Sequence, residues 1–170
     1  MPHPFGLQSG STPDDKSAKF TVIFREVPNP HPDFTNYEGT WSVKSGLLHI
    51  NAWSQDFIDD FSGYRALRLY DRVKRQLHSV YGNNKELEYI DQSSIWFGDN
   101  EFSKSIDVGD RRHWSIWNKE TNARLDSDIS SIGLHIFSGA AYTTLRVMII
   151  YKFSNFESHE NEDIVGASSL

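Results

Sequence analysis

The sequence predicts an α+β fold in which one long amphipathic helix packs across one face of a curved antiparallel sheet of six to eight strands. Three observations support this prediction. Residues 62–82 show a sustained helical period, the flanking segments alternate with a period of two, and turn-forming residues separate these segments at short intervals. With 170 residues and 38% hydrophobic content, the chain is long enough for one domain with its own core.

The folded domain is expected to span residues 19–153. Residues 1–18 are rich in Pro, Gly, Ser and Asp without periodicity, which predicts a flexible leader. Residues 154–170 carry four acidic residues and no Lys or Arg, which predicts an acidic flexible tail. The chain has no signal-peptide pattern, no apolar run as long as a membrane span and no cysteine, so we expect a cytoplasmic protein without a membrane segment.

Three strands are expected before the helix. Residues 19–27 alternate apolar with more polar side chains, which indicates a strand with one face more buried than the other. The three prolines of residues 28–32 predict a stiff surface loop, because proline lacks an amide donor and favours extended geometry. Residues 40–44 and 46–53 are predicted to pair as a hairpin.

The predicted helix has two chemically different sides. At 100° per residue its apolar side chains fall within an arc of about 160°, and four arginines lie nearly opposite. These are Arg65, Arg68, Arg72 and Arg75. Three aspartates precede the helix, where free amides and the helix dipole favour a negative charge or a cap. They are Asp56, Asp59 and Asp60. Gly82 suits the left-handed position after the helix.

A β meander is expected after the helix. Short alternating segments between turn residues predict strands at 86–90, 93–97, 101–108, 111–118, 131–137 and 143–153. The last of these strands is apolar at nearly every position, which is typical of a strand in the middle of a sheet. The polar residues 119–128 are expected to form a loop.

Positive charge is concentrated on the predicted helix. Residues 62–82 carry five basic residues against Asp71, a net charge of +4, so the rest of a chain of net charge −6 carries −10. We expect the four arginines to bind an acidic partner protein. Alternatives are nucleic acid phosphates, pairing with the three aspartates before the helix, and a solvated helix face. Nucleic acid is disfavoured because no recognition motif accompanies the arginines.

Five tryptophans suggest either an aromatic binding platform or bulky filling of a curved sheet. Trp114 and Trp117 have opposite parity in one predicted strand, so one of them should point away from the helix. Trp114 is therefore a candidate partner-binding residue. If the space between helix and sheet is hollow, we expect a ligand pocket there. Its candidate lining residues are Trp53, Trp96 and His135.

The sequence contains no signature of a reaction. It lacks HxH, HExxH, GxSxG, GxGxxG, phosphate-loop and EF-hand spacings, so we expect no metal and no cofactor. The aspartate cluster before the helix could do acid–base chemistry, but helix capping explains it more simply. The resulting hypothesis is a non-catalytic protein-interaction or inhibitor-type module. The alternative is a small-ligand-binding protein or enzyme that uses a cavity between helix and sheet.

Overall fold

The computed structural model describes residues 4–12 and 21–156, and it confirms the α+β class. Its elements in chain order are the short 3-10 helix η1 (Pro4–Gly6), β1 (Thr21–Phe24), β2 (Asn36–Ser42), β3 (Gly46–Trp53), α1 (Tyr64–Tyr81), β4 (Lys85–Ile90), α2 (Phe102–Asp107), β5 (Arg111–Asn118), the 3-10 helix η2 (Lys119–Thr121), β6 (Ile129–Ser138) and β7 (Leu145–Phe153).

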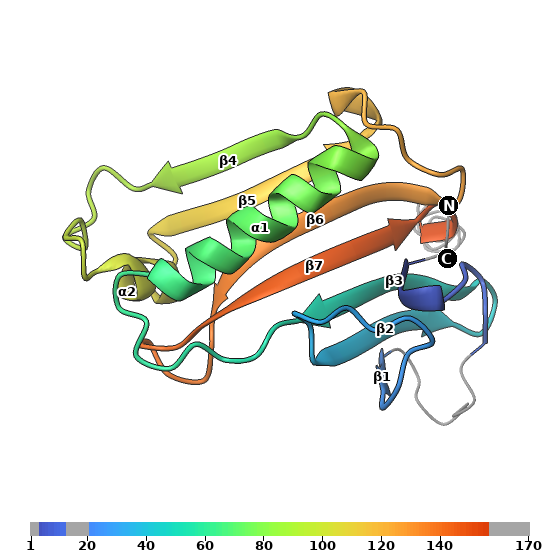
Figure 1. Ribbon diagram of the computed structural model, residues 1–170, viewed down its shortest axis with the longest axis horizontal. Helices are drawn as coiled ribbons and strands as arrows, with labels where there is room; N and C mark the ends of the chain where they lie inside the picture. The colour runs from blue at the N-terminus through green and yellow to red at the C-terminus, as the bar shows by residue number, and fades with distance from the viewer. Residues whose placement is uncertain (1–3, 13–20, 157–170) are drawn as a thin grey trace, which may run out of the picture.

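The described strands form one open antiparallel sheet of seven strands in the order β1-β2-β3-β7-β6-β5-β4 (Figure 1). From β3 the chain passes through α1 to the far edge of the sheet. The meander from β4 to β7 then returns, and β7 pairs with β3. The strand that is apolar at nearly every position, β7, lies in the middle of the sheet as predicted.

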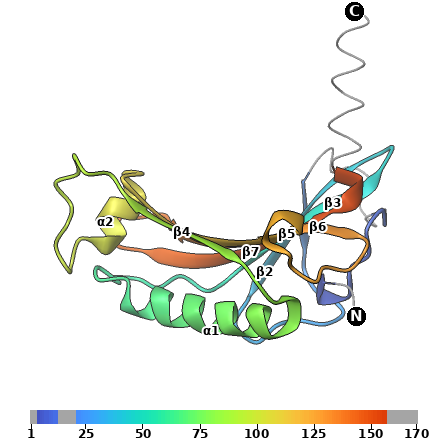
Figure 2. The same ribbon diagram turned by 90° about the horizontal axis from the view of Figure 1, so that it is seen from above.

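Helix α1 covers one face of the sheet and runs along its strands (Figure 2). Its first turn is capped by Asp60, whose carboxylate accepts the amides of Arg65 at 3.2 Å and Ala66 at 2.9 Å. This carboxylate satisfies two of the amides that the first turn leaves without an intrahelical partner. At the other end Gly82 donates its amide to the carbonyl of His78 at 2.9 Å. Its φ is positive, at 82°, but its ψ of −135° differs from the left-handed helical conformation predicted for this glycine. The helix therefore begins and ends where its flanking residues predict.

The space beneath α1 is packed. Leu69, Tyr70, Val73 and Leu77 of the helix are buried together with the apolar side chains of β6 and β7. The Tyr70 hydroxyl lies 2.6 Å from the Ser115 hydroxyl on β5, and both residues are fully buried. This buried polar contact helps to fix the position of the helix over the sheet.

Two predicted strands are absent. Residues 93–97 form a loop, and residues 101–108 contain helix α2 instead of a strand. The strand prediction for 101–108 is wrong because its buried residues follow a helical spacing. Phe102 and Ile106 lie four positions apart on the buried side of α2, which Ser103 and Ser105 complete.

Part of the predicted leader packs on the domain. The Phe5 ring lies 4.9 Å from the Tyr37 ring and 5.7 Å from the Tyr151 ring, centroid to centroid. The Gly10 amide donates to the Leu47 carbonyl at 3.0 Å. Residues 1–3 and 13–18 of the leader and residues 157–170 of the tail lie outside the described residues. No helix in the described ranges has the length and apolar character needed to cross a membrane.

Candidate functional site

The four predicted arginines all lie exposed on α1, and three of them line one hollow of about 300 Å³ beside the N-terminal half of the helix. The three are Arg65, Arg68 and Arg72. The other walls come from the loop before β2 and the segment after β3, through Pro32, Asp33, Thr35, Gln55 and Phe57. We call this space the arginine hollow. Arg75, one turn further along α1 than Arg72, does not line it.

Two of these arginines are already paired. The Arg72 guanidinium donates to both carboxylate oxygens of Asp33, at 2.6 and 3.2 Å. Arg65 lies 3.8 Å from the Asp60 carboxylate and donates to the carbonyl of Ile58. The predicted pairing with the aspartates before the helix therefore occurs for Arg65, whereas Arg72 pairs with an aspartate from the proline-rich loop.

Arg68 differs from its two neighbours. Its guanidinium lies 5.5 Å from the centroid of the Tyr64 ring and donates to the Tyr64 hydroxyl at 3.4 Å. Within the described part of the chain no carboxylate pairs with it. Arg68 is therefore the guanidinium in the arginine hollow that is available to a carboxylate from outside.

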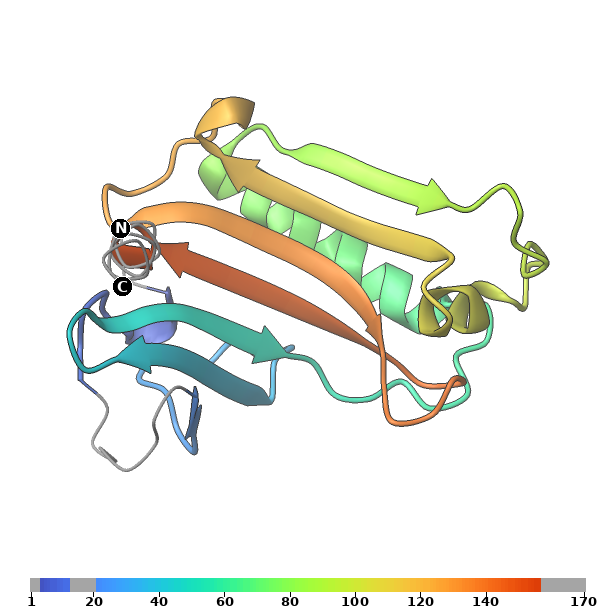
Figure 3. The same cartoon turned by 180° about the vertical axis from the view of Figure 1, so that it is seen from behind.

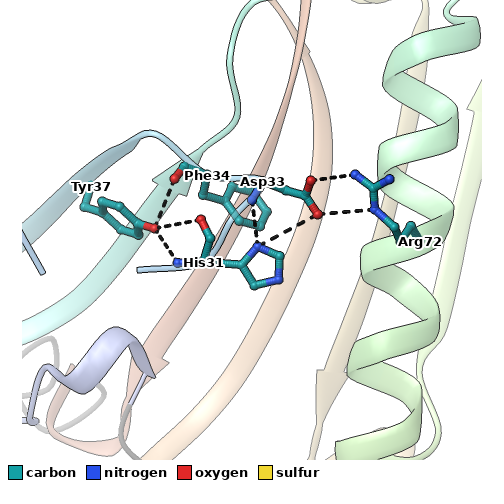
Figure 4. A network of polar contacts seen from close by, with 5 residues as sticks. All are labelled: His31, Asp33, Phe34, Tyr37 and Arg72. Atoms are coloured by element: carbon teal, nitrogen blue, oxygen red, sulfur yellow. Dashed lines mark hydrogen bonds and ion pairs between the residues drawn. The ribbon is translucent and has the colours of Figure 1, made fainter. Parts of the chain in front are cut away.

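A hydrogen-bond network holds Asp33 in place against the helix (Figure 4). The Tyr37 hydroxyl accepts the His31 amide at 2.9 Å and donates to the Phe34 carbonyl at 3.1 Å. The Asp33 amide in turn donates to Nδ1 of His31 at 3.1 Å. The alternate prolines of residues 28–32 stiffen the approach to this loop, so the Asp33 carboxylate is presented to Arg72 at little cost in conformational entropy.

A second hollow lies further along the same side of α1. It has a volume of about 410 Å³, and far more of its lining is carbon than nitrogen or oxygen. Its walls are Val73, Gln76, Leu77, Val80 and Tyr81 of α1, Ile149 and Tyr151 of β7, and Phe5, His31 and Phe34. We call it the apolar pocket. It opens between the C-terminal half of α1 and the sheet, at the edge of the packed core, because its walls include Val73 and Leu77 of that core.

The apolar pocket has few polar groups, and two of them are paired with each other. The side chains of Tyr81 and Tyr151 are hydrogen-bonded to one another. Burial is the main cause that raises the pKa of both phenols above the usual value, so both keep their protons at neutral pH. The pocket therefore has aromatic walls that include two uncharged phenols.

Trp114 lies on the face of the sheet opposite α1, because the adjacent Ser115 in β5 contacts Tyr70 of α1 and successive side chains of a strand point to opposite faces. On that face no described helix crosses the central strands (Figure 3). Its ring is stacked on His135 at 5.4 Å and 6°, and His135 is stacked on Phe137 at 5.5 Å and 20°. Phe137 lies 5.7 Å from Trp53, whose ring has the Arg146 guanidinium 5.2 Å from its centroid. We call these side chains the aromatic row. Burial is the first cause that lowers the pKa of His135, to about 4, and Lys152 is the second.

The three residues predicted to line a ligand pocket do not meet beneath the helix. Trp53 and His135 belong to the aromatic row on the far face, where both are cross-strand partners of Met148. Trp96 lies in the loop between β4 and α2, with the Lys104 ammonium 5.8 Å from its ring. The alternation of side chains along a strand shows which residues share a face of the sheet, but it does not show which of the two faces the helix covers.

The three aspartates before α1 have different surroundings. Asp56 lies 3.4 Å from Arg146, Asp60 caps the helix, and the backbone of Asp59 is left-handed at φ 56°. No group of three or more His, Cys, Asp or Glu side chains in the described ranges is placed to hold a metal ion.

The site residues that the sequence did not predict are Asp33 and the lining of the apolar pocket. No local pattern links Asp33 to an arginine 39 positions later.

The fold and the site define a class: an α+β protein with one open antiparallel sheet, one long covering helix, and two adjoining hollows along the flank of that helix. No protein family, curated protein or solved structure matches this chain. The function proposed below therefore depends on the geometry of the site alone.

Proposed function

We propose that the protein is a non-catalytic interaction module that binds an acidic segment of a partner protein in the arginine hollow. The observation that carries this proposal is the convergence of Arg65, Arg68 and Arg72 on one hollow, with Arg68 unpaired by any described carboxylate. The bidentate pair of Arg72 with Asp33 supports it, because it is the geometry in which a guanidinium recognises a carboxylate.

The charge distribution supports a ligand that carries only a few negative charges. The chain carries a net charge of −6, so a strongly anionic partner is repelled at long range except where the arginines gather. Three arginines line the hollow, and Asp33 and Asp60 pair with two of them, which leaves one positive charge in excess. That balance suits one or two carboxylates from a partner and is a poor match for a polyphosphate backbone.

A small-ligand function is the second candidate, and the apolar pocket is the observation that favours it. Its volume of about 410 Å³ falls in the range of small-molecule sites, and such sites combine apolar walls with a few polar groups. The test is titration with a medium-chain fatty acid, followed by nuclear magnetic resonance. Saturable shifts at the Val73 and Leu77 amides that Val80→Glu abolishes would favour this second candidate.

The acidic-segment proposal is tested with paired synthetic peptides, one rich in glutamate and the other with glutamine at the same positions. Fluorescence anisotropy is measured at ionic strengths of about 0.01 M and about 0.15 M, where the Debye length falls from about 30 Å to about 8 Å. We expect the glutamate peptide to bind, the glutamine peptide not to bind, and the higher salt to weaken the complex.

The discriminating variants are Arg68→Glu and the control Arg75→Glu. Both reverse one exposed charge on α1, but Arg75 does not line the arginine hollow. An exposed ion pair contributes about 0.2 to 1 kcal/mol, so we expect Arg68→Glu to weaken binding up to about fivefold more than Arg75→Glu. Equal losses in both variants, or no difference between the glutamate and glutamine peptides, would contradict the proposal.

A further inference from the structure

We infer that the arginine hollow and the apolar pocket form one bipartite site. It binds a partner segment that carries an acidic residue and, about four residues away, a bulky aliphatic or aromatic side chain. This inference rests on the proposed function, because the acidic residue must occupy the arginine hollow.

The two hollows are lined by neighbouring residues of the same two segments, the loop before β2 and helix α1. The loop before β2 gives Asp33 to the arginine hollow and His31 and Phe34 to the apolar pocket, while α1 gives Arg72 to the first and Val73 to the second. The ion pair of Asp33 with Arg72, which Figure 4 shows beside His31 and Phe34, therefore joins two residues that are adjacent in sequence to lining residues of the apolar pocket. A ligand that fills both hollows must pass over this ion pair.

The spacing follows from the helix. Arg68 in the first hollow and Leu77 in the second are nine positions apart on α1, which corresponds to about 13 Å along the helix axis. An extended peptide advances about 3.3 to 3.6 Å per residue, so a separation of about four residues spans this distance.

The electrostatic half of the site is too weak to act alone. One excess positive charge at an exposed position gives at most about a fivefold gain in affinity. Full burial of a leucine or phenylalanine side chain contributes more, about tenfold or greater. The aromatic walls of Phe5 and Phe34 and the half-exposed Val80 at the rim give such a side chain an apolar surface to bury. In one peptide ligand, the acidic residue would then supply the specificity and the apolar residue would supply most of the affinity.

The boundary between the hollows favours a peptide over a fatty acid. An acyl chain that joined the two hollows would place methylene groups against the Asp33–Arg72 ion pair, and desolvating these charges without new hydrogen bonds is unfavourable. A peptide backbone instead offers an amide donor to the carboxylate and a carbonyl acceptor to the guanidinium. The occupant that fits the whole site is therefore a segment of a protein.

The experiment uses the full chain and a series of acetylated peptides, each with one glutamate and one phenylalanine joined by a glycine-serine linker of increasing length. Dissociation constants come from amide chemical shifts in two-dimensional nitrogen–proton spectra. The variants are Arg68→Glu in the arginine hollow and Val80→Glu at the rim of the apolar pocket. Their controls are Arg75→Glu and Ser79→Glu, which place the same charge on exposed positions of α1 that line neither hollow.

We expect the affinity to peak when the phenylalanine lies about four residues from the glutamate. Arg68→Glu should weaken the best peptide about fivefold and Val80→Glu about tenfold, while each control changes its affinity less than twofold. Spectra of the free variants that match the original chain away from the substituted residue show that folding is intact.

Three results would overturn the inference, and they are distinguishable. Binding that needs the glutamate and Arg68 but not the phenylalanine or Val80 leaves the proposed function standing and refutes the bipartite site. Binding that needs the phenylalanine but is unchanged by Arg68→Glu and by glutamine in place of glutamate refutes both. Dodecanoate binding that Val80→Glu abolishes, with no peptide binding at any linker length, also refutes both and assigns the apolar pocket to a small ligand.

Discussion

The contact between the Tyr70 and Ser115 hydroxyls makes a quantitative prediction about the packed interior beneath α1. The two oxygens lie 2.6 Å apart, and the residues are 1% and 0% exposed. Tyr70→Phe removes the phenolic oxygen and leaves the Ser115 hydroxyl buried without this partner. A lost buried hydrogen bond that leaves its partner unsatisfied costs about 1 to 3 kcal/mol, so we expect the free energy of unfolding to fall by about 2 kcal/mol.

The double variant separates this contact from ordinary packing. Ser115→Ala alone should also cost about 2 kcal/mol, because it leaves the phenol unpaired. Tyr70→Phe combined with Ser115→Ala removes both polar groups, and such a paired removal is nearly neutral when the shapes are kept. We therefore expect the double variant to cost about 1 kcal/mol rather than the sum of about 4, a coupling of about 3 kcal/mol.

Urea denaturation followed by tryptophan fluorescence measures all four proteins of this cycle. A loss of about 2 kcal/mol should also lower the midpoint of thermal unfolding by about 4 to 8 °C in a domain of this length. Single-variant losses that simply add in the double variant would refute the reasoning, because they would mean that the two hydroxyls do not share a hydrogen bond in the folded protein.

Two further predictions concern stability. The pKa of His135 is lowered to about 4 in the folded protein, so between pH 6.5 and 4 the unfolded chain takes up a proton that the folded chain does not. The free energy of unfolding should therefore fall as the pH falls through this window, by at most about 3 kcal/mol and by about 1 to 2 kcal/mol after solvent screening. His135→Phe should flatten the pH profile of the free energy measured by urea unfolding. An unchanged slope of this profile in the variant contradicts the prediction. Gly63→Ala places a Cβ 2.3 Å from the Phe102 ring at φ 71°, whereas at Gly109, with φ 82°, no atom lies within 4 Å of the new Cβ. We expect Gly109→Ala to lower the free energy of unfolding by about 1 kcal/mol through backbone strain, and Gly63→Ala to lower it by at least about 2 kcal/mol more through the clash with Phe102. Equal melting temperatures for the two alanine variants would contradict the packing of α2 against the start of α1.

Periodicity predicts the parts of the fold that local physics determines. Helix α1 has both an apolar stripe and a terminal glycine, and its observed limits lie within two residues of the predicted ones. The central place of β7 follows from a strand that has almost no polar face. In contrast, α2 has only six residues, which is too short for a helical period to be recognised in the sequence. The irregular alternation of apolar and polar residues in this segment therefore predicts a strand, and only its contacts in the fold show that it is a helix.

The candidate site could be predicted only in part. The exposed arginines on one side of α1 follow from the helical wheel, because a solvent-facing stripe is set by the same period as the buried one. The hollow they line depends on where the proline-rich loop returns. The contact of Asp33 with Arg72, like the docking of Phe5 on Tyr37, joins segments that are distant along the chain, and no local pattern encodes such a contact.

The two sides of the sheet differ in what they can offer a ligand. In the aromatic row, Trp114, His135 and Phe137 are stacked on one another, so their ring faces are already used. The ring of Trp53 is approached by a guanidinium in the same way. A platform for a sugar or a base needs a free ring face, and the stacking contacts of this row leave fewer ring faces free. The flank of α1, by contrast, combines unfilled apolar volume with a guanidinium that no described carboxylate pairs, and this combination is the reason that we propose the helix side of the sheet for ligand binding.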